Sequence, residues 1–407
     1  MRKSFFSVLL ISVLLLSGCA NINSDENAPT AYNSPNSSAA VSESNDTTVT
    51  SDSSATPSTN QTVSDIDTSQ VQGKITNLHY IDDNKILIVA DNLYLYDLYS
   101  GSILKQTERA SFSEENYQAI ENGFAVIGIG GDNNGDGGMI VVSGDSVVSC
   151  IIYDIELNKV LEIRGSQLVG EDELFFSPLL LTVSWDGTKI AYATDMALYL
   201  YDIATGNKST LINLADDDAA GRSGLSIFEE LAFINGGSTI AFVSKSFDVP
   251  AVVGASSFDT YGTINADGTG LSVKRSTDYS VKNMIAYDSM IFWAEDFTVS
   301  SGRLMLMDNR SGESRILNLA STLESGCVFG SESGQYFATA TINEDSVIVR
   351  VYDAETATLL LEEAIIEESE YMSRQPVIRV FDNSKTCLVL LGNRQSDIAT
   401  KILTFNF

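Results

Sequence analysis

The chain has 407 residues, with 54 acidic side chains against 24 basic ones and a formal net charge of −30. This acidity argues against a general nucleic-acid binder, which needs clustered Lys and Arg for the phosphate backbone. The single histidine, His79, excludes a multi-histidine metal site and leaves one candidate base for a histidine-dependent triad. Apolar residues make up 44% and charged residues 19%, so most of the chain has the composition of a folded core.

The first 18 residues have the form of a secretory signal peptide. Arg2 and Lys3 precede an apolar run, residues 5–16, that is too short for a comfortable transmembrane helix. The sequence LSGC at 16–19 resembles the processing box of bacterial lipoproteins, in which the Cys thiol receives a diacylglyceryl group and becomes the new N-terminus. This resemblance implies lipidation at Cys19, export, and a lipid anchor in the cell membrane, either at the cell surface or in the periplasm.

Residues 19–70 have the composition of a disordered tether. Ser, Thr and Asn dominate, Tyr32 is the only aromatic residue, and no basic residue occurs between Cys19 and Lys74. Such a segment buries too little apolar surface to offset the entropy lost on ordering. We therefore predict a flexible stalk that carries one folded domain, residues 71–407.

The chain beyond the tether is predicted to be all-β. Short runs rich in β-branched and aromatic residues are separated by Gly, Asn and Asp, and long amphipathic helices are absent. One segment recurs: an apolar strand, an Asp, a tight turn and a second strand. Clear copies occupy residues 93–106, 151–163, 198–211, 304–317 and 349–363, and a weaker copy occupies 261–275.

The repeated acid falls at equivalent positions in the clear copies. An Asp at the end of a strand can accept hydrogen bonds from the backbone amides that follow it, so we predict a turn-forming role for this residue in place of a catalytic one. The five positions are Asp97, Asp154, Asp202, Asp308 and Asp353.

The period of the repeat predicts a β-propeller, because about 50 residues per four-stranded unit is typical of a propeller blade. Units counted from Lys74 number seven; six or eight blades are the alternatives. The last unit, residues 375–407, ends after its third strand. We predict that residues just before Lys74, such as Thr68–Gln72, supply the missing outer strand and close the ring.

A family resemblance supports this architecture. The segment SWDGTKIAYATDMALYLYDIATGNKSTL, residues 184–211, resembles the repeat of TolB-type and WD-like propellers, with Trp185 in place of the usual Pro. Its Y-D-x-x-T-G part is also similar to quinoprotein-type propeller repeats, which include the barrel-assembly lipoprotein of Gram-negative outer membranes. The resemblance implies a propeller, a fold that hosts many functions.

One loop has the pattern of a cation site. In GGDNNGDGG, residues 130–138, the side chains of Asp132, Asn134 and Asp136 offer oxygen ligands at alternate positions, as at the start of a calcium loop. An EF-hand-like loop would continue to a Glu at the place occupied by Ser143. A glycine-rich hairpin tip is therefore the alternative to calcium, and no other cofactor is expected.

No hydrolase, nucleotide-binding or zinc-protease motif occurs, so no catalytic residue is assigned. We expect His79 to be a core or channel-lining residue, and Cys150, Cys327 and Cys387 to be buried thiols with one disulfide left open. The leading hypothesis is a non-enzymatic lipoprotein whose propeller binds or scaffolds a protein or a glycan, in an undefined oligomeric state and without nucleic acid. The alternatives are a carbohydrate-active propeller enzyme with channel carboxylates, and an envelope-assembly factor similar to the barrel-assembly lipoprotein.

Overall fold

The residues that the computed structural model describes all lie within Gln61–Phe407, the compact unit that contains the repeats. The described residues are 64–112, 114–130, 142–143, 148–170, 173–175, 177–214, 225–247, 257–275, 281–286, 290–295, 303–308, 314–317, 319, 325–331, 333–342, 346–366, 376–391 and 401–407. Within these ranges, no helix has the length and apolar character needed to cross a membrane.

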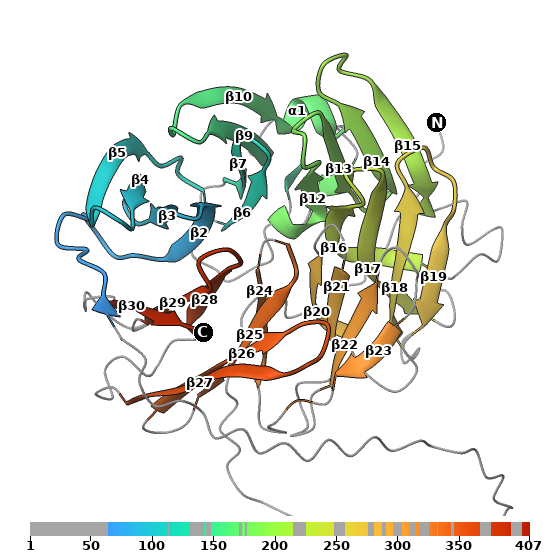
Figure 1. Ribbon diagram of the computed structural model, residues 1–407. Helices are drawn as coiled ribbons and strands as arrows, with labels where there is room; N and C mark the ends of the chain where they lie inside the picture. Colours follow the sequence, from blue (N-terminus) through green and yellow to red (C-terminus); the bar gives the residue numbers. More distant parts are fainter. Residues whose placement is uncertain are drawn as a thin grey trace, which may run out of the picture. The chain divides into compact units, whose positions relative to one another are not determined.

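The described strands form seven four-stranded antiparallel sheets, which we call blades, so the predicted all-β propeller is confirmed (Figure 1). The first blade consists of β2 (Asn77–Asp82), β3 (Lys85–Val89), β4 (Asn92–Asp97) and β5 (Ser102–Glu108). The second consists of β6 (Glu114–Ile120), β7 (Gly123–Ile129), β9 (Val148–Asp154) and β10 (Lys159–Arg164). The third consists of β12 (Leu181–Val183), β13 (Lys189–Ala193), β14 (Ala197–Asp202) and β15 (Lys208–Asn213).

The next three blades follow the same order of strands. The fourth blade consists of β16 (Leu225–Ile234), β17 (Thr239–Phe247), β18 (Ser257–Asn265) and β19 (Ser272–Arg275). The fifth consists of β20 (Val281–Ala286), β21 (Met290–Glu295), β22 (Arg303–Asp308) and β23 (Ser314–Leu317). The sixth consists of β24 (Ser325–Gly330), β25 (Tyr336–Ile342), β26 (Ser346–Asp353) and β27 (Leu359–Ile366). A small sheet of β8 (Val142–Ser143) and β11 (Leu174–Phe175), the one-turn helix α1 (Gly165–Leu168) and a 3₁₀ turn (Pro178–Leu180) lie between the second and third blades in sequence.

The seventh blade is built from both ends of the described chain. It contains β28 (Val377–Phe381), β29 (Thr386–Leu391), β30 (Lys401–Asn406) and, as its outer strand, β1 (Ser64–Asp65). Ser64 pairs with Thr404, and the Ile66 amide donates to the carbonyl of Ile402 at 3.0 Å. The residues before Lys74 therefore do complete the last blade.

The predicted position of that strand was wrong. Residues Thr68–Gln72 form no strand, because the chain turns there. The Asp67 carboxylate accepts the Ser69 amide at 2.9 Å, and the Val71 amide donates to the Thr68 carbonyl at 2.9 Å. This turn directs the chain from the seventh blade into β2, and the ring begins at Ser64, inside the segment predicted as tether.

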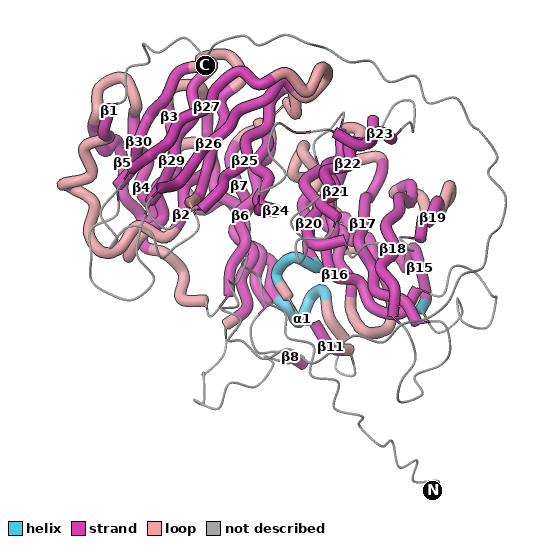
Figure 2. The backbone as a smooth tube through the Cα atoms, turned by 90° about the horizontal axis from the view of Figure 1, so that it is seen from below, coloured by secondary structure: helices cyan, strands magenta, loops and turns pink. Residues whose placement is uncertain are grey.

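The ring closes through the first strand of each blade. Each of these strands contacts the first strand of the next blade, and β28 contacts β2. Because successive strands are antiparallel, the turns from first to second and from third to fourth strand share one side of the ring, which we call the turn face. The other connections, with α1 and β11, leave from the opposite side, and Figure 2 shows α1 and the C-terminus at opposite ends of the strands.

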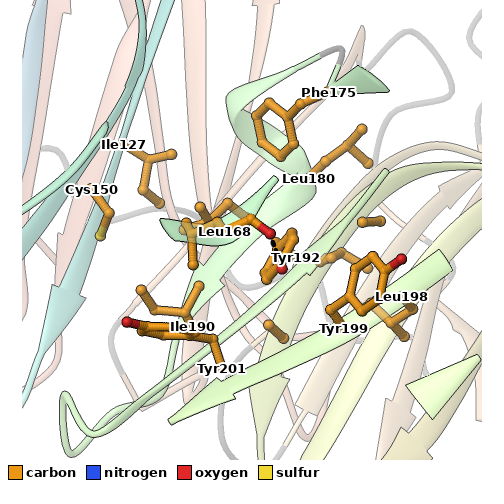
Figure 3. Packing of buried hydrophobic residues seen from close by; sticks show 14 of the residues in the cluster. Ile127, Cys150, Leu168, Phe175, Leu180, Ile190, Tyr192, Leu198, Tyr199 and Tyr201 are labelled. Atoms are coloured by element: carbon orange, nitrogen blue, oxygen red, sulfur yellow. Dashed lines mark hydrogen bonds between the residues drawn. The ribbon is translucent and has the colours of Figure 1, made fainter. Parts of the chain in front are cut away.

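Buried apolar side chains fill the space between neighbouring blades. The largest cluster joins the second, third and fourth blades. Figure 3 shows part of it, including Ile127, Cys150 and Tyr192, which are fully buried. Cys150 and Cys387 are buried free thiols, as predicted, and burial raises the pKa of Cys150 to about 12. The side chain of Cys327 lies outside the described part of the chain.

Candidate functional site: the junctions between the first strands

The sites predicted from local motifs fall outside the described residues. These are the lipidation site, Cys19, and the calcium ligands Asp132, Asn134 and Asp136, so both sites stay predictions. In the ranges that the structure describes, no group of three or more His, Cys, Asp and Glu side chains is arranged to hold a metal ion.

The repeated Asp residues have the turn-forming role that the sequence predicted. Asp97 accepts the Ser100 amide at 2.6 Å, and Asp202 accepts the Thr205 amide at 2.8 Å. Asp353 accepts the Thr356 amide in the same way, and Asp154 accepts the amides of Glu156 and Asn158. These hydrogen bonds lower the pKa values of Asp97, Asp154 and Asp202, so the carboxylates are charged at neutral pH. The side chain of Asp308 is not among those described.

A second group of polar side chains lies on the first strands, where neighbouring blades meet around the centre of the ring. Their contacts cross from one blade to the next, so they are the strongest candidates for a shared role. The group consists of His79, Tyr117, Gln118, Thr182, Glu230 and Arg379.

Gln118 and Thr182 join three consecutive blades. The Gln118 side chain on β6 accepts the Val183 amide at 2.9 Å and donates to the Thr182 hydroxyl at 2.9 Å. The same hydroxyl on β12 accepts the Phe233 amide of β16 at 3.4 Å. These bonds satisfy amides that the edges of the sheets would otherwise leave without a partner.

Arg379 joins the seventh blade to the first. Its guanidinium on β28 donates to the Leu78 carbonyl at 2.5 Å and to the Asn77 side chain at 3.1 Å, both on β2. The neighbouring residue on β2, His79, stacks on Tyr117 of β6 with 4.5 Å between ring centroids. His79 therefore lies at the junction of the first and second blades, in agreement with the expected core or channel-lining position.

The His79–Tyr117 pair is electrically neutral near pH 7. Burial, and then the positive charge of Arg379, hold the pKa of His79 well below its ordinary value. The His79 Nε2 atom and the Tyr117 hydroxyl are both buried, and neither has a hydrogen-bond partner within the part of the chain that the structure describes. Burial also raises the pKa of Tyr117, so neither ring carries a charge in the folded protein near neutral pH.

Glu230 is the one strongly perturbed carboxyl of this group. Its Oε2 atom on β16 accepts the Met284 amide of β20 at 3.0 Å and so joins the fourth and fifth blades. Burial raises the pKa of Glu230 to about 8, the charge of Glu229 raises it further, and the Met284 amide opposes the shift. A carboxyl of this kind is largely protonated at neutral pH and has a proton to donate.

A separate polar cluster contacts the connection between the second and third blades, the excursion that carries α1 and β11. The Lys208 ammonium on β15 donates to the Leu168 carbonyl at 3.0 Å and to Glu173 at 3.1 Å, and it lies 3.7 Å from the ring centroid of Tyr199. The Tyr199 hydroxyl also donates to Glu173. Three partners saturate Lys208, so this cluster fixes the chain from α1 to β11 against the third blade.

Sequence reasoning did not find Gln118, Glu230 or Arg379. Arg379 interrupts an otherwise apolar strand, VIRVF, and that interruption is a local signal. Gln118 and Glu230 lie in strands with other polar residues, EENYQAI and LSIFEELAFI, so the local sequence does not single them out. His79 was placed correctly, because a lone histidine in an apolar strand has few other roles.

Comparison with a solved β-propeller domain supports the fold alone. No protein-family profile and no curated protein sequence matches the chain. The β-propeller domain of Myceliophteria thermophila Cps50 (Swd1) is similar over 85% of this chain and 100% of its own, with a TM-score of 0.56 and 10% identity. Kuenenia stuttgartiensis hydrazine synthase is similar over 81% of this chain and 94% of its own, with a TM-score of 0.48 and 10% identity.

Proposed function

We propose that this chain is a membrane-anchored extracytoplasmic lipoprotein whose propeller is a binding or scaffolding module for a protein or a glycan. The observation that carries the proposal is the use of the polar side chains around the centre. Gln118, Glu230 and Arg379 each bond the backbone of a neighbouring blade, which gives a rigid ring that can hold variable surface loops in place.

The N-terminal sequence supports the anchored part of the proposal. Cys19 follows a signal-like segment, and the acidic, Ser-, Thr- and Asn-rich residues that follow suit a stalk between a membrane and a domain. Metabolic labelling with a fatty acid in a bacterial host should modify the full chain and leave Cys19→Ser unlabelled. Equal labelling of the two proteins would exclude lipidation at Cys19.

The binding function is tested with the lipid-free domain. Residues 61–407, immobilised on beads, should retain a stoichiometric protein or a defined polysaccharide from the envelope fraction of the source cells. A propeller of the same size and charge on identical beads is the control. Retention of the same material by both propellers, or of none by either, would contradict the proposal.

One observation favours a second candidate, a carbohydrate-active enzyme. Glu230 is a protonated carboxyl on an innermost strand, and such a group suits the general acid of glycoside cleavage. Under this alternative, the domain would cleave polysaccharide and Glu230→Gln would remove the activity. Cleavage that survives Glu230→Gln would rule out Glu230 as the acid.

A further inference from the structure

Three apolar side chains are exposed on the turn face of consecutive blades. Tyr99 is 94% exposed in the β4–β5 turn, Ile155 is 44% exposed in the β9–β10 turn, and Trp185 is 43% exposed in the β12–β13 turn. Single exposed apolar residues are ordinary, but these three lie on the same face of three consecutive blades. We call these three residues the turn-face patch.

The patch is held by rigid backbone. Ser184 and Asp186 bond each other at 2.6 Å on either side of Trp185, and Gly187 in this turn has φ +68°. The Glu121 amide of the second blade donates to the Trp185 carbonyl at 2.8 Å. Trp185 is thus fixed on an ordered hairpin with 43% of its surface exposed, which lowers the entropy lost when a partner covers it.

The hairpins of the first and second blades are also joined. The Lys105 ammonium, six residues beyond Tyr99 in sequence, donates to the Asn158 side chain at 2.5 Å in the turn that carries Ile155. The charges of Asp97 and Glu156 both act on Lys85, after its main partner Asp82. The turns around Tyr99 and Ile155 are therefore neighbours across one blade junction.

Carboxylates surround the patch. The turns that carry its three residues, and those next to them, contain Asp97, Glu121, Asp154, Glu156, Asp186 and Asp202. Hydrogen bonds within the turns lower the pKa values of Asp97, Asp154 and Asp202, so these groups stay charged. Bases are fewer on these turns: Lys85 bonds Asp82 at 2.8 Å, Lys105 donates to Asn158, and Lys159 and Lys189 follow the β9–β10 and β12–β13 turns. The surface therefore repels anionic partners and attracts cationic ones.

We propose that the turn-face patch docks a Lys- and Arg-rich segment of a partner protein, with aliphatic stems and cations on Tyr99 and Trp185 and positive charges on the surrounding carboxylates. Aromatic rings bind cations through their faces, and Trp and Tyr are the residues that dominate protein interfaces. This inference rests on the proposed binding function and adds to it the chemistry of the partner and the face that meets it.

The test uses the lipid-free chain and a fluorescein-labelled 12-residue peptide of alternating Lys and Ser, with a Glu-Ser peptide of equal length for comparison. The patch variant is Tyr99→Ser/Trp185→Ser. The control variant is Leu360→Ser/Met196→Ser, which changes two exposed apolar residues elsewhere on the described surface, 39% and 50% exposed. Fluorescence anisotropy at low and high salt measures affinity, and circular dichroism confirms that each variant is folded.

We expect the wild type to bind the Lys peptide and not the Glu peptide. The affinity for the Lys peptide should fall by about tenfold in the patch variant and by less than twofold in the control variant. A tenfold change in affinity corresponds to the loss of one good aromatic contact. Equal affinity of both variants, or preference for the Glu peptide, overturns the inference. The result is separable from the proposed function: capture of a partner that the patch variant retains equally would overturn the docking face and leave the binding function standing.

Discussion

The Oε2 atom of Glu230 accepts a hydrogen bond from the backbone N–H of Met284 at 3.0 Å, so a single carboxyl joins the first strands of the fourth and fifth blades. The carboxyl makes this bond in a site where burial raises its pKa to about 8. The same contact therefore stabilises the junction and makes it sensitive to pH, in a direction opposite to that of most carboxylates.

Stability is expected to fall as the pH rises from about 4.5 to about 8 through this group. Over that range, the folded chain holds a proton on Glu230 that the unfolded chain, with an ordinary pKa of 4.5, has lost, so each step upward in pH favours unfolding. Glu230→Gln keeps an oxygen acceptor for Met284 and cannot ionise. We expect it to raise the free energy of unfolding at pH 8, by up to roughly 4 kcal/mol for a pKa difference of this size, and to have little effect at pH 4.5.

Urea denaturation of both proteins at the two pH values measures this difference. Glu108→Gln, on the exposed outer strand β5, is the matched control and should have a similar effect at each pH. An effect of Glu230→Gln that is the same at pH 4.5 and pH 8 would mean that the carboxyl is not protonated in the folded chain.

The turn carboxylates give the opposite dependence on pH. The pKa values of Asp97, Asp154 and Asp202 are lowered by the bonds they accept, so their contribution to stability is present above the ordinary Asp pKa near 4 and is lost as the pH falls through the lower, folded values. We expect Asp202→Ala to lower the Tm at pH 7 and Asp202→Asn, which keeps the acceptor oxygen, to lower it less. Differential scanning calorimetry at pH 7 and pH 3 gives the comparison, and the difference in Tm between each variant and the wild type should be smaller at pH 3.

Ring closure predicts a sharp boundary for truncation from the N-terminus. A chain that begins at Gln61 keeps β1 and should match the longer protein in Tm. A chain that begins at Thr68 lacks the strand that covers β30 and the Ile66 side chain that packs beside Ile402, and it should melt at least several degrees lower and associate through the open edge. Light scattering and thermal melts of the two chains test this. Equal melting temperatures would show that β1 does not stabilise the ring.

The Lys208 cluster should couple the α1–β11 excursion to the third blade. Lys208→Met keeps the length of the side chain and removes the charge between Glu173 and the Tyr199 ring, and we expect a loss of about 1–2 kcal/mol in the free energy of unfolding. In a double-mutant cycle with Glu173→Gln, the two effects should not be additive. The surface pair Lys159–Glu162, with Lys159 half-exposed, serves as the comparison and should show a coupling near zero.

The features that could be predicted from the sequence are those that depend on residues close together in the chain. The seven blades followed from a regular period, and the turn bonds of Asp97 and Asp202 followed from local side-chain chemistry. The contacts of Gln118, Glu230 and Arg379 did not, because each depends on which two blades meet and in what register. The closing strand was misplaced by a few residues because β1 is two residues long, and so short a strand has no hydrophobic pattern to read.

The pairing of Ser64 with Thr404 also sets the order in which the protein can fold. A chain that leaves the ribosome or an export channel N-terminus first presents β1 long before its partner β30 exists, so the seventh blade must form last. Until then the other six blades form an open arc, and the first and sixth blades each have one face that no neighbouring blade covers. Contacts between residues so far apart in sequence slow folding, and the open arc is the species most exposed to misassembly. Because the two ends of the chain close the ring together, the ring cannot close until the final strand has been synthesised.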